Sequence, residues 1–172
     1  MNKKAAFDTI VNLFRLLFVI VVFYSVLFLA RAFIVQNVNI FEVESKLLAH
    51  RLTFSSGINY IDTDTGRIHI GVIDLQKFNS NDIEKNLLNS IYYGRINSEA
   101  SAKLTLKDLD DNLEYEAFYN KELYNEKKVI VESKIIGEGA AQRLDTNFYV
   151  LIKDNDKLKN GVLNVDTILP NR

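Results

Sequence analysis

The 172-residue sequence contains no cysteine, no tryptophan, one proline and two histidines. Without cysteine, the chain cannot form a disulfide, a thiolate zinc site, an iron–sulfur cluster or a cysteine nucleophile. Two histidines are too few for a three-histidine metal site built from one chain. The net charge of −1 argues against broad nucleic-acid binding. What remains is the composition of an ordinary folded protein, with 25% charged and 48% apolar residues.

The apolar residues are concentrated near the N-terminus. Residues 16–30 read LLFVIVVFYSVLFLA without a charge, and Arg15 and Arg31 bound this run. A membrane-spanning helix needs about 17–25 mostly apolar residues. Residues 13–35 are long enough if both guanidinium groups reach the membrane interface. We therefore predict a cytoplasmic tail and transmembrane anchor over residues 1–36, since the rest of the chain is too small to enclose a buried core helix.

The orientation of this anchor follows from the basic residues around it. Lys3, Lys4 and Arg15 precede the apolar run, and this bias favours a cytoplasmic N-terminus. Residues 37–172 would then form a domain outside the cytoplasm, attached to the cell membrane by a single span. Two other interpretations stay open: secretion after cleavage of a signal peptide near Ala32, and a prepilin-type leader.

A second helix is predicted directly after the anchor. Asn39 and Glu42 have the spacing of a capping box, and a helix that starts there would continue to about Phe54. An apolar stripe recurs along it at steps of three, four and seven. The stripe consists of Ile40, Val43, Leu47 and Phe54, and Leu48 and Leu52 widen it. It is the candidate interaction site, either for packing on the domain or for pairing with a partner helix.

The remaining sequence favours strands. A hairpin closed by DTDTG is predicted over residues 58–75, and a short helix with a capping-box-like start over 81–93. Strand patterns follow at 102–106, 114–123, 128–136, 147–153 and 161–169. The sequence thus predicts an α+β fold, with an N-terminal transmembrane helix, a membrane-proximal helix and a mainly antiparallel sheet that carries one short helix.

Few residues have the spacing of a chemical site. Asp62, Asp64 and Asp74 resemble the start of a calcium loop, but the pattern lacks the later ligands, so a plain hairpin turn is the simpler interpretation. Neither His50 nor His69 has a diagnostic partner. We therefore predict no catalytic residues, no metal site and no cofactor.

Three stretches carry a family resemblance. They are LAHRLTFSS at 48–56, YIDTDTGR at 60–67 leading to GVIDL at 71–75, and YVLI at 149–152 followed by GVLNV at 161–165. Together they resemble uncharacterised archaeal single-pass membrane proteins with a pilin-like layout. This resemblance implies a hydrophobic N-terminal helix followed by a β-rich head.

Two hypotheses about function follow. In the first, the protein is a structural or assembly component of a pilin-like, cell-surface or secretion complex, and it acts through protein–protein contacts. Its partners would be membrane lipid and other membrane or cell-surface proteins, a second copy of this chain included, but no nucleic acid. In the second, the extracytoplasmic domain is a ligand-binding or sensory module with a concave pocket. No spaced set of nucleophile, base and orienting group predicts an enzyme.

Overall fold

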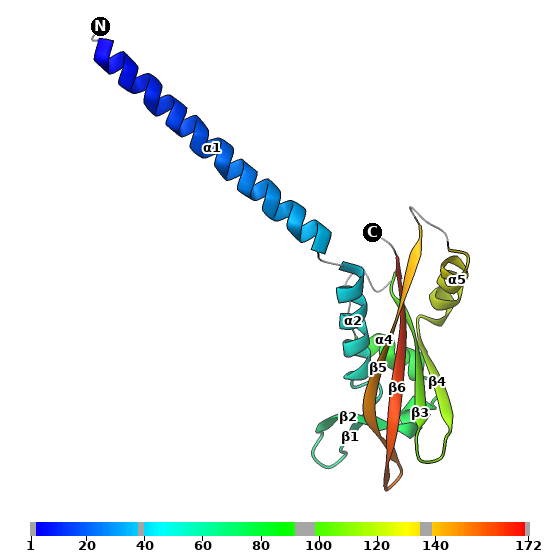
Figure 1. Cartoon of the computed structure of the whole chain (residues 1–172). Coiled ribbons are helices and arrows are strands. Elements are labelled where there is room, and N and C mark those ends of the chain that lie inside the picture. The colour runs from blue at the N-terminus through cyan, green and yellow to red at the C-terminus, as the bar shows by residue number, and fades with distance from the viewer. Residues whose placement is uncertain (1–2, 38–39, 92–98, 135–138, 171–172) are drawn as a thin grey trace. The chain divides into compact units, whose positions relative to one another are not determined.

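The computed structural model describes residues 3–37, 40–91, 99–134 and 139–170. The chain divides into two compact units, Met1–Ile40 and Phe41–Arg172, so the division falls four residues beyond the anchor boundary predicted at residue 36. Figure 1 labels the elements of both units except α3.

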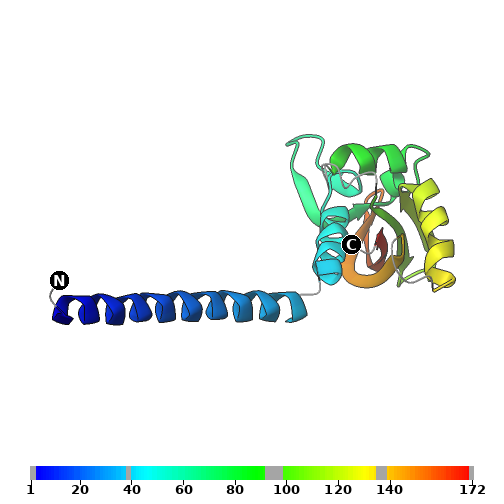
Figure 2. The ribbon, with the colours of Figure 1, turned by 90° about the horizontal axis from the view of Figure 1, so that it is seen from above.

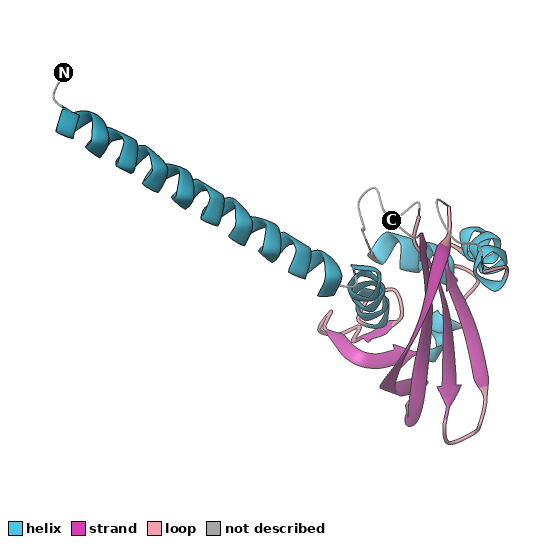
Figure 3. Ribbon diagram, turned by 45° about the horizontal axis from the view of Figure 1, so that its top comes forward, coloured by secondary structure: helices cyan, strands magenta, loops and turns pink. Residues whose placement is uncertain are grey.

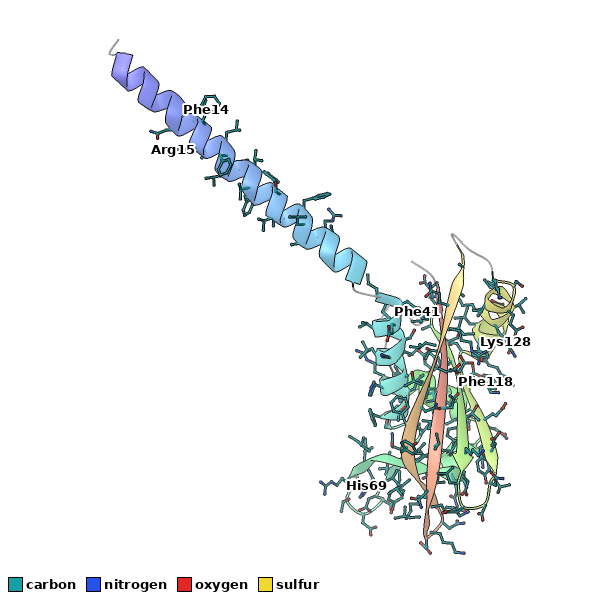
Figure 4. All side chains as sticks on the ribbon, in the orientation of Figure 1. Phe14, Arg15, Phe41, His69, Phe118 and Lys128 are labelled. Atoms are coloured by element: carbon teal, nitrogen blue, oxygen red, sulfur yellow. The ribbon has the colours of Figure 1, made fainter. Side chains whose placement is uncertain are left out.

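The first unit contains the long helix α1 (Lys3–Asn37). Its segment Asn12–Ala32 has a mean hydropathy of 2.6, and none of it is buried. These 21 residues form about 31 Å of α-helix, which matches the roughly 30 Å hydrocarbon core of a bilayer. Figure 4 shows side chains projecting all around this helix. Helix α1 is therefore long and apolar enough to span a membrane, consistent with a single-pass or signal anchor.

The second unit is built on one six-stranded sheet with the order β1-β2-β5-β6-β3-β4. The strands are β1 (Asn59–Ile61), β2 (Ile68–Asp74), β3 (Ser101–Asp108), β4 (Glu114–Tyr119), β5 (Ala141–Asp154) and β6 (Lys157–Pro170). Four of the five strand pairings are antiparallel, and β2 pairs with β5 in parallel over three residues. Figure 3 shows the long central strands and the short, crossing β2. The predicted α+β class and mainly antiparallel sheet are confirmed.

Helices cover both faces of this sheet. Helices α2 (Ile40–Thr53), α3 (Leu75–Phe78) and α4 (Ile83–Ser90) contribute side chains to the main core, together with Leu163 and Val165 of β6. Asp166 and Ile168 of β6 are also buried, but they point to the opposite face because side chains alternate along a strand. Helix α5 (Lys121–Glu132) lies on that face, where Tyr124 donates a hydrogen bond to Asp166. Figure 2 shows α2 and α5 on opposite sides of the curled sheet.

The sequence prediction was wrong around α5. Strands were predicted over 114–123 and 128–136, but the first ends at Tyr119 and residues 121–132 are helical. Residues 123, 124, 127, 130 and 131 are buried or half-buried, which is helical spacing. Packing of this face against the sheet therefore overrides the strand preference of the β-branched run at 129–131. The described part of this unit accordingly has three short helices after α2, namely α3, α4 and α5, where one was predicted.

Most other predicted elements lie where expected. The hairpin β1–β2 and helix α2 match their predicted segments. Strands β5 and β6 are also present, but β5 begins six residues and β6 four residues before the predicted start. The capping box at the start of α4 is not formed, because the N-cap residue is Asp82 and it makes no side-chain cap bond. The predicted cap at Asn39 lies outside the described residues.

Candidate interaction surface

One face of α2 anchors the helix to the sheet. Leu48, Ala49 and Leu52 are fully buried in the core. The C-terminus of the helix is fixed as well, because the Asn59 side-chain amide donates to the backbone carbonyls of Thr53 (2.8 Å) and Ser55 (2.7 Å). These bonds satisfy carbonyl groups that a helix end leaves without partners. Helix α2 is thus a fixed part of its unit.

The opposite face of α2 carries the residues that the sequence predicted as an interaction site. The exposed fractions are 64% for Ile40, 58% for Val43, 45% for Leu47 and 44% for Phe54. His50, also exposed, lies between the last two, so that the five residues follow one another at steps of three and four. We call Ile40, Val43, Leu47, His50 and Phe54 the α2 stripe.

The structure corrects one part of the predicted stripe. Leu48 and Leu52, which were expected to widen it, face the core instead. Helix α2 therefore has two separate apolar faces, one buried against the sheet and one exposed. Among the described residues, packing of the stripe on the domain, one of the two roles considered for it, is seen at its end, where the aromatic rings of His50 and Phe54 meet Phe148 of β5.

This aromatic end leads into a shallow groove. The ring centroid of His50 lies 5.6 Å from that of Phe54 and 5.1 Å from that of Phe148. Beside these rings is an open groove of about 530 Å³. It is lined by His50, Arg51, Phe54, Ser55, Ser56, Ile68, Ser90 and Ile91. The exposed apolar surface thus continues from the helix into a concave region of the second unit.

The chemistry of the groove bears on the predicted ligand-binding role. Its volume falls within the range of small-molecule sites. However, the Ser55 hydroxyl donates to the carbonyl of Leu52 (2.9 Å), and the Ser90 hydroxyl donates to that of Leu87 (3.0 Å). Two of the polar groups that line the groove therefore use their donors within the protein. A small ligand would depend mainly on apolar contact here.

Two of the three residues considered for calcium, Asp62 and Asp64, lie in a plain hairpin turn. The Asp62 carboxylate accepts hydrogen bonds from the backbone N–H of Asp64 (3.0 Å) and from the hydroxyl of Thr65 (2.8 Å). The Thr65 bond, followed by the Asp64 bond, lowers the pKa of Asp62. Asp74 caps α3 by accepting from two backbone N–H groups. Among the described residues, no group of three histidine, aspartate or glutamate side chains is arranged to hold a metal ion.

The second histidine lies on this hairpin, far along the chain from His50. His69, labelled in Figure 4, is exposed. Its ring is tilted by 38° to the ring of Tyr60, with 5.4 Å between the two ring centroids. Lys153 Nζ lies 4.3 Å from the centroid of the Tyr60 ring. These contacts give His69 a place in the surface packing of β1 and β2 against β5.

A buried polar cluster that the sequence did not reveal joins α5 to the sheet. Asp166 accepts a hydrogen bond from the Tyr124 hydroxyl and another from Arg143 Nε (2.8 Å). Burial, reinforced by the bond to Asp166, raises the pKa of Tyr124. Burial also raises the pKa of Asp166, although its two donors act in the opposite direction. The three residues are far apart in sequence, so no local pattern marks them as neighbours.

A second charged cluster surrounds one lysine at the other end of the central strands. Lys159 Nζ lies 2.6 Å from Asp111 Oδ2, 3.2 Å from Asp154 Oδ2 and 3.3 Å from Asp108 Oδ2. The bonds to Asp111 and Asp154 are the main reason that the pKa of Lys159 is raised. Since an ammonium group already occupies the centre of these carboxylates, the cluster is a structural ion-pair network.

Comparisons with known proteins do not identify a family for this chain. No protein-family model matches the chain. Neither the curated proteins nor the solved structures contain a significant match to it. Function must therefore be argued from the residues themselves.

Proposed function

We propose that the protein is a membrane-anchored component of a cell-surface or secretion-type assembly and acts through protein–protein contacts. The observation that carries this proposal is the α2 stripe, whose apolar side chains are exposed although α2 itself is fixed to the sheet. Scattered exposed apolar residues are normal on protein surfaces, whereas a continuous row of them is typical of an interaction site. Its place soon after an apolar helix favours a partner in or near the membrane.

In this proposal α1 crosses the membrane once, with the N-terminus in the cytoplasm and the second unit outside. The basic residues before the apolar run support this orientation. The pilin-like layout is part of the same proposal, since an apolar N-terminal helix followed by a β-rich head suits display at the cell surface. Carbonate-resistant retention of the intact chain would distinguish an uncleaved anchor from secretion after cleavage near Ala32.

The absence of native cysteine makes the orientation directly testable. Val129→Cys places a single thiol on α5 at a site that is 62% exposed. We expect a membrane-impermeant maleimide to label this variant in intact cells of the native host. Labelling only after lysis would place the second unit in the cytoplasm and contradict the proposed surface assembly.

Contacts of the stripe can be tested with a second single thiol. Leu47→Cys, modified with a photoactivatable benzophenone maleimide in native membranes, is expected to give protein adducts upon illumination. Leu109→Cys is the matched control, because Leu109 is 48% exposed and Leu47 is 45% exposed. Equal adduct yields from both variants, or adducts with lipid alone at Leu47, would contradict a role in protein contacts.

The groove beside Phe54 supports a second candidate function, an extracytoplasmic ligand-binding or sensory module. A volume of about 530 Å³ suits a small apolar ligand. Ser56→Trp would place a large side chain at the exposed rim of the groove. If the protein is a sensor, this change should abolish binding of apolar ligands found by screening the purified full chain, while the adducts at Leu47 should persist.

A further inference from the structure

The α2 stripe has the shape of a helix-pairing seam. Its residues are spaced three, four, three and four apart, an average of 3.5, as at the a and d positions of a heptad repeat. Leu52 and Ser45, which point away from the stripe, are buried against the sheet. The stripe therefore lies opposite the core-facing side of the helix. Its residues Ile40, Val43 and Leu47 are exposed for contact with another helix, while the rings of His50 and Phe54 also meet Phe148.

The narrowness of the stripe favours a helix over a lipid surface. A helix that lies in the membrane interface usually carries a broad apolar face and basic residues on its polar side. Here the stripe is one side chain wide, and polar residues flank it, including the ion pair between Glu42 and Lys46 (2.6 Å). A strict a and d row is typical of the seam between two helices.

We propose that the α2 stripe pairs with the α2 stripe of a second copy of this chain in the same membrane. This inference rests on the proposed function and names the partner. In each copy Ile40 follows Ala32, the last residue of the apolar span, by eight positions. A chain of at most about 29 Å joins the two residues. Anchored copies therefore hold their stripes within the same range of heights above the bilayer.

Because the contact between two stripes is small, the association depends on the membrane anchor. Five side chains on each helix form a small interface, well below the roughly 1,200 Å² that stable soluble complexes bury. Confinement to one membrane raises the effective concentration of the second copy, as a linker does for tethered modules. The pairing should therefore be present in native membranes and lost when the full chain is diluted in detergent.

Cysteine crosslinking between two tagged copies tests the pairing. Two forms of the full-length Leu47→Cys variant, each with a different C-terminal tag, are expressed together in the native host, and its membranes are treated with a mild oxidant. Leu47 lies at the middle of the stripe, so it faces the second stripe whichever way the second helix runs. A disulfide needs Cα atoms within about 7 Å. We expect a dimer that carries both tags, at least ten-fold more abundant than with the matched Leu109→Cys control.

A second substitution separates pairing from random collision. Val43→Lys, added to Leu47→Cys, places a charge on the stripe at a site that is 58% exposed. It should lower the yield of the doubly tagged dimer at least ten-fold, whereas Val129→Lys on α5 should leave it unchanged. Equal yields from Leu47→Cys and Leu109→Cys, or no effect of Val43→Lys, would overturn the inference.

Failure of this inference can be told apart from failure of the proposed function. If benzophenone at Leu47 gives adducts only with other proteins and no doubly tagged dimer forms, the second copy is excluded and the assembly role stands. If the thiol at Leu47 captures neither a second copy nor another protein, both proposals fail.

Discussion

Replacing Tyr124 with phenylalanine tests what holds α5 on the sheet. Tyr124 and Asp166 are each 3% exposed, and the Tyr124 hydroxyl donates to Asp166 Oδ2. In Tyr124→Phe the ring still fills its site, but one buried carboxylate oxygen loses its donor. Arg143 continues to bind the other oxygen, Oδ1, at 2.8 Å. The expected effect is thus the loss of one hydrogen bond to a charged group, without a cavity.

The magnitude follows from that geometry. A buried hydrogen bond to a charged group contributes about 1.5–3 kcal/mol, and an unsatisfied buried acceptor costs a similar amount. We expect the free energy of unfolding to fall by about 2–3 kcal/mol. With a urea slope of about 2 kcal/mol per molar, the unfolding midpoint should fall by about 1–1.5 M. Near-UV circular dichroism of the full chain in detergent can follow this transition, since tyrosine is the main chromophore in a chain without tryptophan.

A second tyrosine provides the matched control. Tyr149 is 90% exposed, so Tyr149→Phe removes a hydroxyl that already faces solvent, and the midpoint should not move. Combining Tyr124→Phe with Asp166→Asn completes a double-mutant cycle that isolates the pair. If Tyr124→Phe proved as stable as Tyr149→Phe, or if the cycle showed no coupling, the cluster would not be what holds α5.

Three further predictions concern other parts of the chain. The folded pKa of Tyr124 lies above its ordinary value of about 10, so the stabilising effect of the protonated hydroxyl is complete below pH 10 and declines as the pH rises toward the folded pKa. From pH 9 to pH 11.5 the urea midpoint should therefore fall further for the wild type than for Tyr124→Phe, and equal falls would contradict the raised pKa. Val22→Arg places a charge within the apolar span at a cost of about 2.5–3.5 kcal/mol, so carbonate extraction should release the variant, and its retention would contradict the span. Leu48→Ala should lower the free energy of unfolding by about 2–5 kcal/mol, and Leu47→Ala by less than about 0.5 kcal/mol; similar urea midpoints for the two variants would refute the assigned faces of α2.

The paired strands and the first hairpin were predictable because their signals are local. The segment DNDK between β5 and β6 is polar, and Asn155 adopts a positive φ of 53° within it, a conformation that asparagine tolerates better than most residues. The alternation of apolar residues on both sides then fixes the strands. The place of β2 in the sheet was not predictable, since its parallel pairing with β5 joins segments about 80 residues apart.

Helix α5 was not predictable for a related reason. Val129 and Ile130 belong to a β-branched run that favours a strand. The helix is stabilised from outside its own sequence, by packing and by the bond between Tyr124 and Asp166, 42 residues further along the chain. The sequence of the helix itself contains neither the residues against which it packs nor Asp166.

Helix α2 was predicted correctly, but its apolar pattern did not show which of its two faces is exposed. Leu47 and Leu48 are adjacent, and both belong to apolar rows with helical spacing. Hydrophobicity alone therefore cannot tell which row meets the sheet. The small residues Ser45 and Ala49 lie on the buried face, whereas the α2 stripe carries only larger side chains. Residue size along each row was thus the signal in the sequence that distinguished the core face from the exposed stripe.

Part of the sheet surface is polar and open to water, in contrast to the apolar α2 stripe. On that face Lys103 pairs with Glu116 at 2.6 Å, and the side chain of Asn164 donates to that of Asn147 at 2.9 Å. Such cross-strand polar pairs are typical of a face in contact with water. Tyr149 stands out from this surface, but it is not part of a row with helical spacing. If association depends on a seam between helices, Tyr149→Phe added to Leu47→Cys should leave the doubly tagged dimer intact, whereas a small change elsewhere in the stripe, Val43→Ala, should weaken it.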